Sequence, residues 1–323
     1  MDPDPSVTAL PAGLGPQAHV RHALHADDRV WVEKNCAIDV WIELTHALGL
    51  EPRAMLGVTA AMDFLGDQWT FFKPSNEALR SLYGIDVQEL TLWRPLQDHV
   101  LEHLAAGRLV CVEADAWWLP DTAATDYRRQ HTKTTIVIAA CDPRAERLVY
   151  FHNAGLYALE GEDYRCTLSN GGLPLPLFAE WVDPRRRVAR TEDDLRAECR
   201  RRLREHLAWR PADNPVRRFQ ARYLADQALL RQQGLAHYHA WAFANTRQLG
   251  AAMELLGEHL LWLDEAPQAA ADFHTVAQGC KTLILKAARA VAGPRDLDGA
   301  ELFDAMAAGW ERGMARTVAA LGP

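Results

Sequence analysis

The sequence predicts an α+β domain followed by a helical bundle. The first supporting observation is the mixed pattern of the first half, where short β-branched runs alternate with amphipathic stretches up to about Asp183. The second is that every pattern beyond Pro184 is helical. The third is the connector between them, which is rich in glycine and proline. We therefore expect three parts: a flexible N-terminal arm over residues 1–30, a mixed domain over 31–185 and a helical domain over 186–323.

Local signals place the elements of the mixed domain. Gly49 and Pro52 end a helix that runs from Cys36 to Leu48. The two clearest strands, 134–140 and 147–151, are joined by a hairpin loop at residues 142–146, so residue numbers paired across the hairpin sum to about 288. Further helices are expected over 75–82 and 95–106, and further strands over 68–72, 87–92, 108–113 and 156–159. In the helical domain, breaks at glycine and proline separate helices over 191–209, 214–233, 237–263, 267–291 and 298–320.

The composition argues against some classes of partner. The 323 residues carry a net charge of −8, whereas a general nucleic-acid-binding protein is usually basic. The N-terminus lacks the basic start and apolar core of a signal peptide, and no apolar run approaches the ~20 residues that span a bilayer. We therefore expect a cytoplasmic protein with no nucleic-acid and no membrane partner. The six cysteines are scattered, which favours free thiols over a disulfide framework or a zinc ribbon.

Three residues in chain order indicate a thiol-dependent active site. Cys36 stands at the start of an apolar helical stretch, His131 stands just before a β-branched run, and Asn153 closes the next apolar run. A helix N-terminus favours the thiolate, an imidazole accepts the thiol proton, and a third residue orients the imidazole. The order Cys, His, Asn is that of papain. The sequence therefore predicts a papain-like cysteine-peptidase-type domain with Cys36 as nucleophile, His131 as base and Asn153 as orienting residue.

The register of the predicted hairpin affects which residue is expected to orient His131. Pairs that sum to 288 place Asn153 opposite Thr135, and strand alternation puts Thr135 on the same face as His131. A slip of one residue places His152 there instead, so both residues stay open as the orienting group. A lone cysteine before an apolar helix is more often a small buried hydrophobe, so the prediction depends on the ordered trio.

Two polar loops supply candidate substrate contacts. Gln68 belongs to the first, and its amide is a candidate oxyanion donor beside the Cys36 backbone N–H. A turn cap is the alternative role for Gln68. The second loop leads directly into His131, and such loops commonly carry substrate contacts. Its candidate residues are Asp121, Asp126, Tyr127 and Arg128.

A competing motif is the H-x-x-E-H pattern formed by His99, Glu102 and His103, which is that of the inverted zincins. Two histidines four apart lie on one helix face and can bind zinc, with the glutamate as base. The sequence identifies no third ligand, and short matches arise by chance in a chain with 13 histidines. We therefore predict no metal and no cofactor, and expect an exposed polar helix face here.

Five segments of the chain resemble an uncharacterised bacterial domain family. They are residues 35–39, 66–74, 119–122, 131–136 and 150–155. That family is similar to the papain-like cysteine acyltransferases of the butirosin biosynthesis protein H (BtrH) type. The resemblance covers most of the chain, including its helical half. In related papain-like families the third catalytic position is often Asp before Pro, whereas Asn153 precedes Ala here.

The resemblance implies an acyltransferase of secondary metabolism. Such an enzyme moves an aminoacyl group from the thioester of a phosphopantetheinylated carrier protein to a small-molecule acceptor, with the acyl group on Cys36 and His131 as base. Carrier proteins are acidic, so the arginine runs between Arg185 and Arg222 are candidate docking residues, with solvated helix faces as the alternative. Two other functions stay open: a papain-like peptidase or amidase, if water reaches the acyl-enzyme, and a non-catalytic papain-like interaction module.

Overall fold

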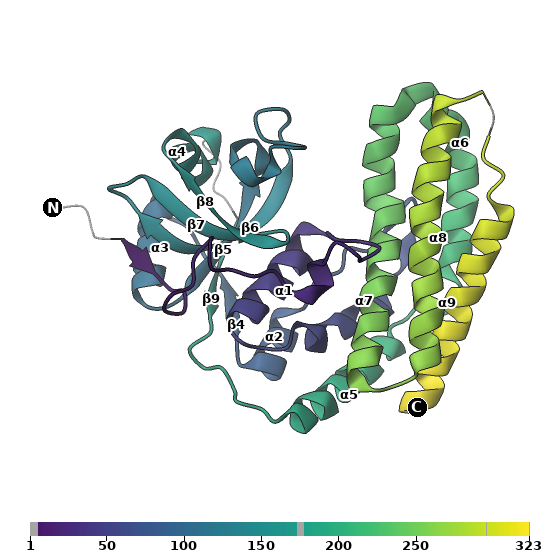
Figure 1. Ribbon diagram of the computed structural model, residues 1–323, viewed down its shortest axis with the longest axis horizontal. Coiled ribbons are helices and arrows are strands. Elements are labelled where there is room, and N and C mark those ends of the chain that lie inside the picture. The colour runs from purple at the N-terminus through teal and green to yellow at the C-terminus, as the bar shows by residue number, and fades with distance from the viewer. Residues whose placement is uncertain (1–5, 173–177, 295, 323) are drawn as a thin grey trace. The chain divides into compact units, whose positions relative to one another are not determined.

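The computed structural model describes residues 6–172, 178–294 and 296–322. The chain divides into two compact units. The first comprises residues 1–26, 35–52 and 74–189, and the second comprises residues 27–34, 53–73 and 190–323. An antiparallel sheet with short helices forms most of the first unit, and long helices dominate the second (Figure 1). The fold is therefore mixed α+β with a C-terminal helical region, as the sequence predicts.

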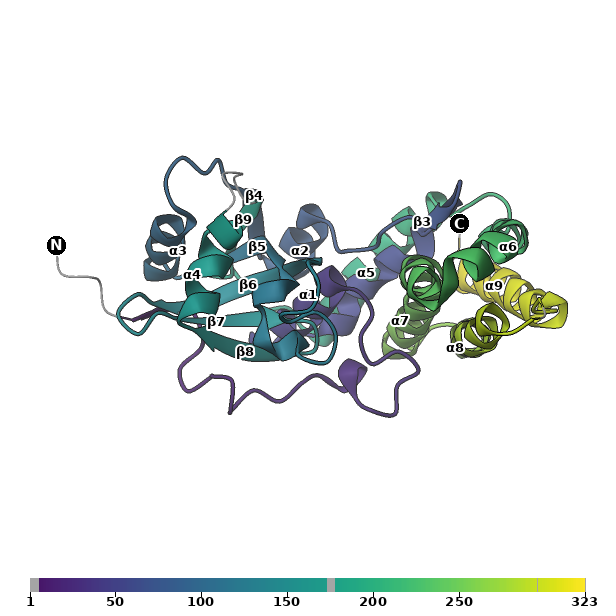
Figure 2. The same ribbon diagram turned by 90° about the horizontal axis from the view of Figure 1, so that it is seen from above.

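The sheet of the first unit contains seven strands among the described residues. Their order is β4-β9-β5-β6-β7-β8, every pair is antiparallel, and β1 pairs with the far end of β6. Figure 2 shows β5 to β8 side by side. The strands are β1 (Val7–Thr8), β4 (Asp86–Glu89), β5 (Leu109–Asp115), β6 (Lys133–Asp142), β7 (Arg147–His152), β8 (Gly155–Glu160) and β9 (Ala179–Asp183).

The register of the central hairpin confirms the sequence-based pairing. Val137 faces Phe151 and Ile138 faces Tyr150, so both pairs sum to 288. The register then shifts by one residue between Ile138 and Ala140, which marks a β-bulge. Such a bulge leaves the pairs near the start of β6 in the predicted register, and these are the pairs nearest His131.

Helices cover both faces of this sheet. They are α1 (Cys36–Ala47), α2 (Asn76–Tyr83), α3 (Leu96–Ala105), α4 (Glu162–Leu168) and the short 3-10 turns η1 (Ala23–His25), η3 (Ala116–Trp118), η4 (Pro120–Thr122) and η5 (Asn170–Gly172). One face packs its alternate residues, such as Val112 and Ile138, into a core with apolar residues of α3 and α4. The opposite face of β6 and β7 packs against α1. Alternation along each strand therefore separates a core face from an α1 face.

The second unit is largely helical. Its long helices contact one another in the pairs α7–α8, α8–α9, α6–α8 and α6–α9. Gly234 interrupts α6 with φ of 80° and ψ of −176°, at the point where the sequence predicts a break. The elements are η2 (Pro52–Ala61), β2 (Phe64–Leu65), β3 (Gln68–Trp69), α5 (Glu192–Ala208), α6 (Pro215–Ala242), the π-helical turn η6 (Phe243–Arg247), α7 (Gln248–Leu263), α8 (Pro267–Ala292) and α9 (Ala300–Leu321).

Some elements differ from the sequence-based prediction. The strand predicted over 68–72 is only two residues long, and helix α4 and strand β9 were not predicted. Strand β9 forms because β4 and β5 supply hydrogen-bond partners on both of its edges, which a local pattern does not reveal. Within the described ranges, no helix has the length and apolarity needed to cross a membrane.

Candidate functional site

Cys36 is the first residue of α1, as predicted. Asn35 has an extended backbone and caps the helix, because its Oδ1 accepts hydrogen bonds from the N–H groups of Ala37 (3.1 Å) and Ile38 (3.0 Å). The Cys36 side chain is half-buried, and its thiol is free. The sequence Asn35-Cys36 therefore puts a thiol at a helix N-terminus, where free N–H groups favour negative charge.

The Cys36 thiol faces the strands β5 and β6. Its Sγ donates to Oγ1 of Thr135 at 3.7 Å. Thr135 pairs across the sheet with Glu113, and Lys133 pairs with Asp115, so all four residues lie on the face that packs against α1. The Lys133 ammonium forms an ion pair with Glu113 at 2.8 Å. Polar and charged groups therefore line the sheet beside Cys36.

The His131 imidazole is held by two neighbours. Its Nδ1 lies 2.6 Å from Oδ2 of Asp115, the last residue of β5. Its ring stacks on the indole of Trp117, with centroids 4.5 Å apart and an interplanar angle of 11°. An Nδ1–H that donates to Asp115 leaves the lone pair on Nε2, which is then able to accept a proton. The His131 side chain is 69% exposed, so this nitrogen is accessible to solvent.

Cys36 and His131 are not hydrogen-bonded to each other among the described residues. Thr135, which contacts the thiol, lies four residues beyond His131, and this is about 13 Å of extended chain at ~3.3 Å per residue. One bridging water does not span such a distance, so proton transfer between them needs a movement of the segment that carries His131. Catalytic hydrogen bonds are often long before substrate binds.

The two candidates for the orienting residue have other contacts in the structure. Asn153 occupies the tight turn between His152 and Gly155 with φ of 42°, a left-handed conformation that asparagine tolerates. This turn accounts for an asparagine at position 153, and its orienting role stays a prediction. The residue that contacts His131 Nδ1 is Asp115.

His152 belongs to a buried network on the core face of the sheet. Its Nε2 lies 2.8 Å from Oγ1 of Thr134, and its Nδ1 lies 2.5 Å from Oδ2 of Asp121. The Tyr150 hydroxyl donates to the other carboxylate oxygen of Asp121 at 2.5 Å. Burial and then the Asp121 carboxylate raise the pKa of Tyr150 far above its usual value. Asp121 therefore holds β7 and η4 together, and its predicted substrate contact stays a prediction.

The other predicted loop residues also make contacts within the first unit. Asp126 Oδ1 accepts from Gln130 Nε2 (2.8 Å) and Thr132 Oγ1 (2.7 Å), the two residues that flank His131. Although burial raises the pKa of Asp126, hydrogen bonds from Thr125, Thr132 and Gln130 hold it below its usual value. Asp126 thus holds the chain on both sides of the imidazole.

Tyr127 and Arg128 join the same loop to α4. The Tyr127 hydroxyl donates to Asp163 at 2.9 Å, and the Arg128 guanidinium bonds to both Glu162 (2.9 Å) and Asp163 (2.6 Å). The guanidinium also lies over the Trp118 ring, 4.4 Å from its centroid. Gln68 is exposed on β3, in the second unit. Substrate contacts by these residues stay predictions.

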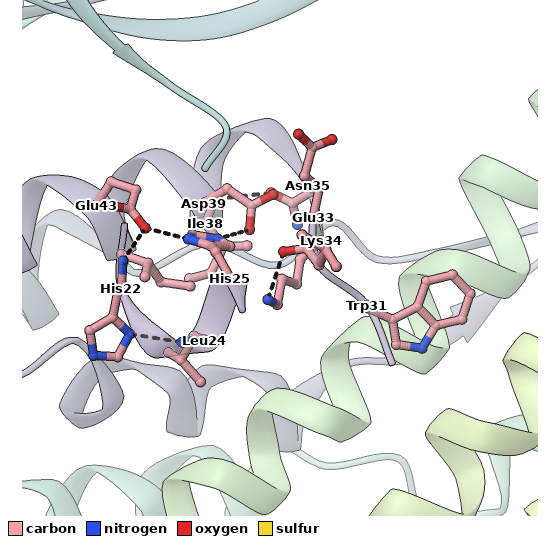
Figure 3. Close-up of polar contacts among 12 residues, drawn as sticks. His22, Leu24, His25, Trp31, Glu33, Lys34, Asn35, Ile38, Asp39 and Glu43 are labelled. Carbon is pink, nitrogen blue, oxygen red and sulfur yellow. Dashed lines mark hydrogen bonds and ion pairs between the residues drawn. The ribbon is translucent and has the colours of Figure 1, made fainter. Parts of the chain in front are cut away.

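Helix α1 contributes Asp39 and Glu43 to a buried cluster with histidines of the N-terminal segment, which the sequence did not reveal (Figure 3). The His25 ring is fully buried between Glu43, at Nδ1, and Asp39, 3.0 Å from Nε2. His19 Nε2 contacts the second Glu43 oxygen at 2.7 Å. Although burial raises the pKa of Glu43, its bonds to His19 and His25 lower it to about 2. These contacts attach part of the predicted flexible arm to α1.

The H-x-x-E-H motif engages other partners. Glu102 forms an ion pair with Arg94, and His103 Nδ1 accepts from Arg108 Nε at 3.0 Å. Burial, and then the Arg108 charge, lower the pKa of His103. His99 is buried beside Trp93, with ring centroids 6.5 Å apart. Across the part of the chain that the structure describes, no group of three His, Cys, Asp or Glu residues is arranged to hold a metal ion.

Most arginines of the predicted docking runs are paired within their own unit. Arg185 pairs with Asp183, Arg217 with Asp304, and Arg222 with Asp226. Arg200, Arg201 and Arg202 pair with glutamates, and Arg218 pairs with Asp63 and Asp213. These ion pairs favour the solvated-face alternative, and a docking role stays a proposal.

Asp115 and Lys133 were missed by the sequence-based reasoning. The predicted strand ended at Glu113, two residues before Asp115, and the register of β5 against β6 depends on a long loop with η3 and η4. Only a hairpin with a short turn predicts its own register. The contacts of Asp115 with His131, and the position of Lys133 beside Thr135, therefore needed the folded sheet.

Comparison with known proteins identifies the family. No curated protein matches the chain. A model of the DUF1839 N-terminal domain matches residues 20–183, and a model of the DUF1839 C-terminal domain matches residues 192–319. The first match covers the residues of the candidate site, Cys36, Asp115, Lys133 and His131. Together the two matches show that the chain belongs to the DUF1839 family.

Proposed function

We propose that this protein is a cysteine-dependent acyltransferase. Cys36 is the nucleophile, and His131, oriented by Asp115, is the general base and acid. The observation that carries the proposal is the half-exposed thiol at the first position of α1, on the sheet face that also carries the Asp115–His131 pair. A thiol at a helix start and an imidazole oriented by a carboxylate are the parts of a nucleophilic site.

The proposed reaction has two half-reactions. First, Cys36 Sγ attacks the carbonyl carbon of a thioester, and His131 Nε2 accepts the thiol proton. The carbon–sulfur bond of the donor then breaks, and the leaving sulfur takes the proton from His131. In the second half-reaction, an amine attacks the acyl-enzyme, the bond to Sγ breaks, and the proton of the amine returns to Sγ through His131.

The papain-like assignment and the donor belong to this proposal. Helix α1, which begins at Cys36, packs on the antiparallel strands β6 and β7, and this supports a papain-like arrangement. The family resemblance of the sequence supports an aminoacyl group on a phosphopantetheinylated carrier protein as donor and a small-molecule amine as acceptor. The charge pairing of the arginine runs means that docking of an acidic carrier requires exchange of existing ion pairs.

Hydrolysis is the second candidate activity. The His131 side chain is 69% exposed, so water reaches the base. An acyl-enzyme in a wet site is hydrolysed, whereas a dry site favours an amine acceptor. A peptidase or amidase activity would therefore use the same Cys36 and His131.

Intact-protein mass spectrometry tests the proposal. The wild type, Cys36→Ala and Cys166→Ala are mixed with carrier protein loaded with an aminoacyl group, and the mass of each is followed over time. Cys166 is also a half-buried free thiol, so its variant is the matched control. We expect an aminoacyl adduct on the wild type and on Cys166→Ala, and none on Cys36→Ala.

Other outcomes separate the alternatives. Release of free amino acid that depends on Cys36, without an adduct, indicates the hydrolase. Acyl transfer that persists in Cys36→Ala contradicts a Cys36 nucleophile. A Cys36 thiol that reacts with iodoacetamide no faster than an unactivated thiol indicates the non-catalytic interaction module.

A further inference from the structure

We propose that Lys133 is the cationic partner that stabilises the Cys36 thiolate. The inference deepens the proposed function and rests on Cys36 being its nucleophile. It assigns to Lys133 an electrostatic role on the attacking sulfur, while His131 remains the group that carries protons.

The geometry begins with the thiol. Cys36 Sγ lies 3.7 Å from Oγ1 of Thr135. Lys133 precedes Thr135 by two residues on β6, so both side chains leave the strand on the face that packs against α1. Residues two apart on a strand are about 6.6 Å apart along it. A long, flexible lysine at position 133 therefore has its ammonium within reach of the sulfur, and His131 lies two residues farther away.

The charged groups around Lys133 come from three elements. Strand β5 contributes Glu113, which pairs with the ammonium at 2.8 Å, together with Asp115 and the buried Cys111. Helix α1 contributes Cys36, and the loop contributes His131, which is engaged by Asp115. Although burial lowers the pKa of Lys133, Glu113 and then the cysteines 36 and 111 raise it. The ammonium therefore stays charged at neutral pH.

The ion pair with Glu113 does not by itself explain why a lysine occupies position 133. Both side chains are largely solvent-accessible, at 59% and 41%, and pairs of this kind contribute little to stability. The chain otherwise prefers arginine, since only five of its 35 basic residues are lysines. A lysine is a compact point charge on a flexible stem, which suits a single sulfur anion better than a planar guanidinium does.

Lys133 also suits the reaction. A thiolate beside an ammonium is formed at a lower pH than a free thiol, so attack on the thioester begins from an ionised sulfur. Thr135 Oγ1 is then placed to donate to that sulfur, reversing the direction of the present hydrogen bond. The two groups together stabilise the sulfur anion before His131 acts.

The experiment measures the rate of alkylation of Cys36 by iodoacetamide between pH 5 and 9, with peptide mapping to assign the site. It uses the full chain as wild type, Lys133→Met, Lys133→Arg and the control Lys73→Met, which removes another exposed lysine. We expect Lys133→Met to react about three to ten times more slowly at pH 7, as expected for the loss of one charge that solvent largely screens. The midpoint of its pH profile should move upward.

The controls decide the interpretation. Lys133→Arg should react at a rate between those of Lys133→Met and the wild type, because it keeps the charge but spreads it over a planar group, and Lys73→Met should match the wild type. If Cys36 of the wild type is alkylated fast and Lys133→Met has the same pH profile as the wild type, the role of Lys133 is overturned and the proposed function stands. A wild-type Cys36 that reacts no faster than free glutathione overturns both. A slow Lys133→Met whose far-UV circular dichroism equals that of the wild type supports the proposal.

Discussion

The Asp115 carboxylate contacts the His131 imidazole at the end of β5. A carboxylate fixes the tautomer and orientation of an imidazole and stabilises the imidazolium that forms during proton transfer. Asp115 makes that contact with His131 at 2.6 Å, and its other oxygen accepts from the backbone N–H of Trp117 at 3.0 Å. One side chain thus contacts the His131 ring and caps the turn that carries the indole on which the ring stacks.

A matched pair of variants distinguishes Asp115 from Asn153. We expect Asp115→Asn to lower the rate of acyl transfer by about 10² to 10⁴, because the amide favours the wrong tautomer of His131. Asn153→Gly keeps the left-handed turn, since glycine adopts φ of 42° without strain, and removes only the amide. Its rate should stay within about threefold of the wild type. Single-turnover transfer rates measure both, and a large loss confined to Asn153→Gly would support Asn153, rather than Asp115, as the orienting residue.

At the scale of the element, the start of α1 combines a helix cap with the proposed nucleophile. Asn35 is buried and satisfies two N–H groups of the first turn, including that of Ile38. Helix ends that lack such a cap leave unsatisfied donors. The same turn places Cys36, so the cap and the proposed nucleophile are neighbours in sequence and share one local structure.

Two variants, each lacking one helix cap, separate the effect of the cap on stability from its effect on the reactivity of Cys36. Asn35→Ala should lower the free energy of unfolding by about 1–2 kcal/mol, as measured for buried caps, and slow alkylation of Cys36. Ser75→Ala removes the exposed cap of α2 and should cost about 1 kcal/mol without changing Cys36. Urea unfolding and iodoacetamide kinetics check both variants. Equal Cys36 reactivity in the two would contradict a role for the α1 start.

The long loop between β5 and β6 is a second element with a defined role. Contacts of Asp121 with β7, and of Tyr127 and Arg128 with α4, attach it at several points. Asp126 holds the residues on either side of His131. The polar residues that led to the prediction of a substrate-binding loop therefore also order the segment that carries His131.

At the scale of the whole molecule, the two units carry different buried titratable groups. Helix α7 in the second unit contains His259, which is fully buried and whose Nδ1 contacts the Arg53 carbonyl at 2.7 Å. Burial lowers the pKa of His259 to about 4. In the first unit, Glu43 has a pKa of about 2. The two groups therefore make stability depend on pH in different ranges.

The direction of the pH dependence of stability follows from which state, folded or unfolded, binds more protons. His259 has a folded pKa of about 4 against an ordinary value of 6.5, so the unfolded chain binds the proton first. Stability of the second unit is full above pH 6.5 and falls as the pH approaches 4. Between pH 7 and 5 the loss should be about 2 kcal/mol. Urea unfolding of the wild type and of His259→Gln at both pH values tests this, since the variant should lose this part of the pH dependence.

The sequence by itself determined the α+β class, the helical second half, the start of α1 at Cys36 and the hairpin register near His131. These features depend on local signals: a cap before an apolar helix, alternation of β-branched residues and a short hairpin turn. Tertiary structure alone decided that Asp115 holds His131, that Lys133 lies on the face of Cys36 and that Asn153 serves a turn. The physical reason is that β5 and β6 are joined by a long loop, so their register depends on packing across the whole sheet rather than on any neighbouring residues.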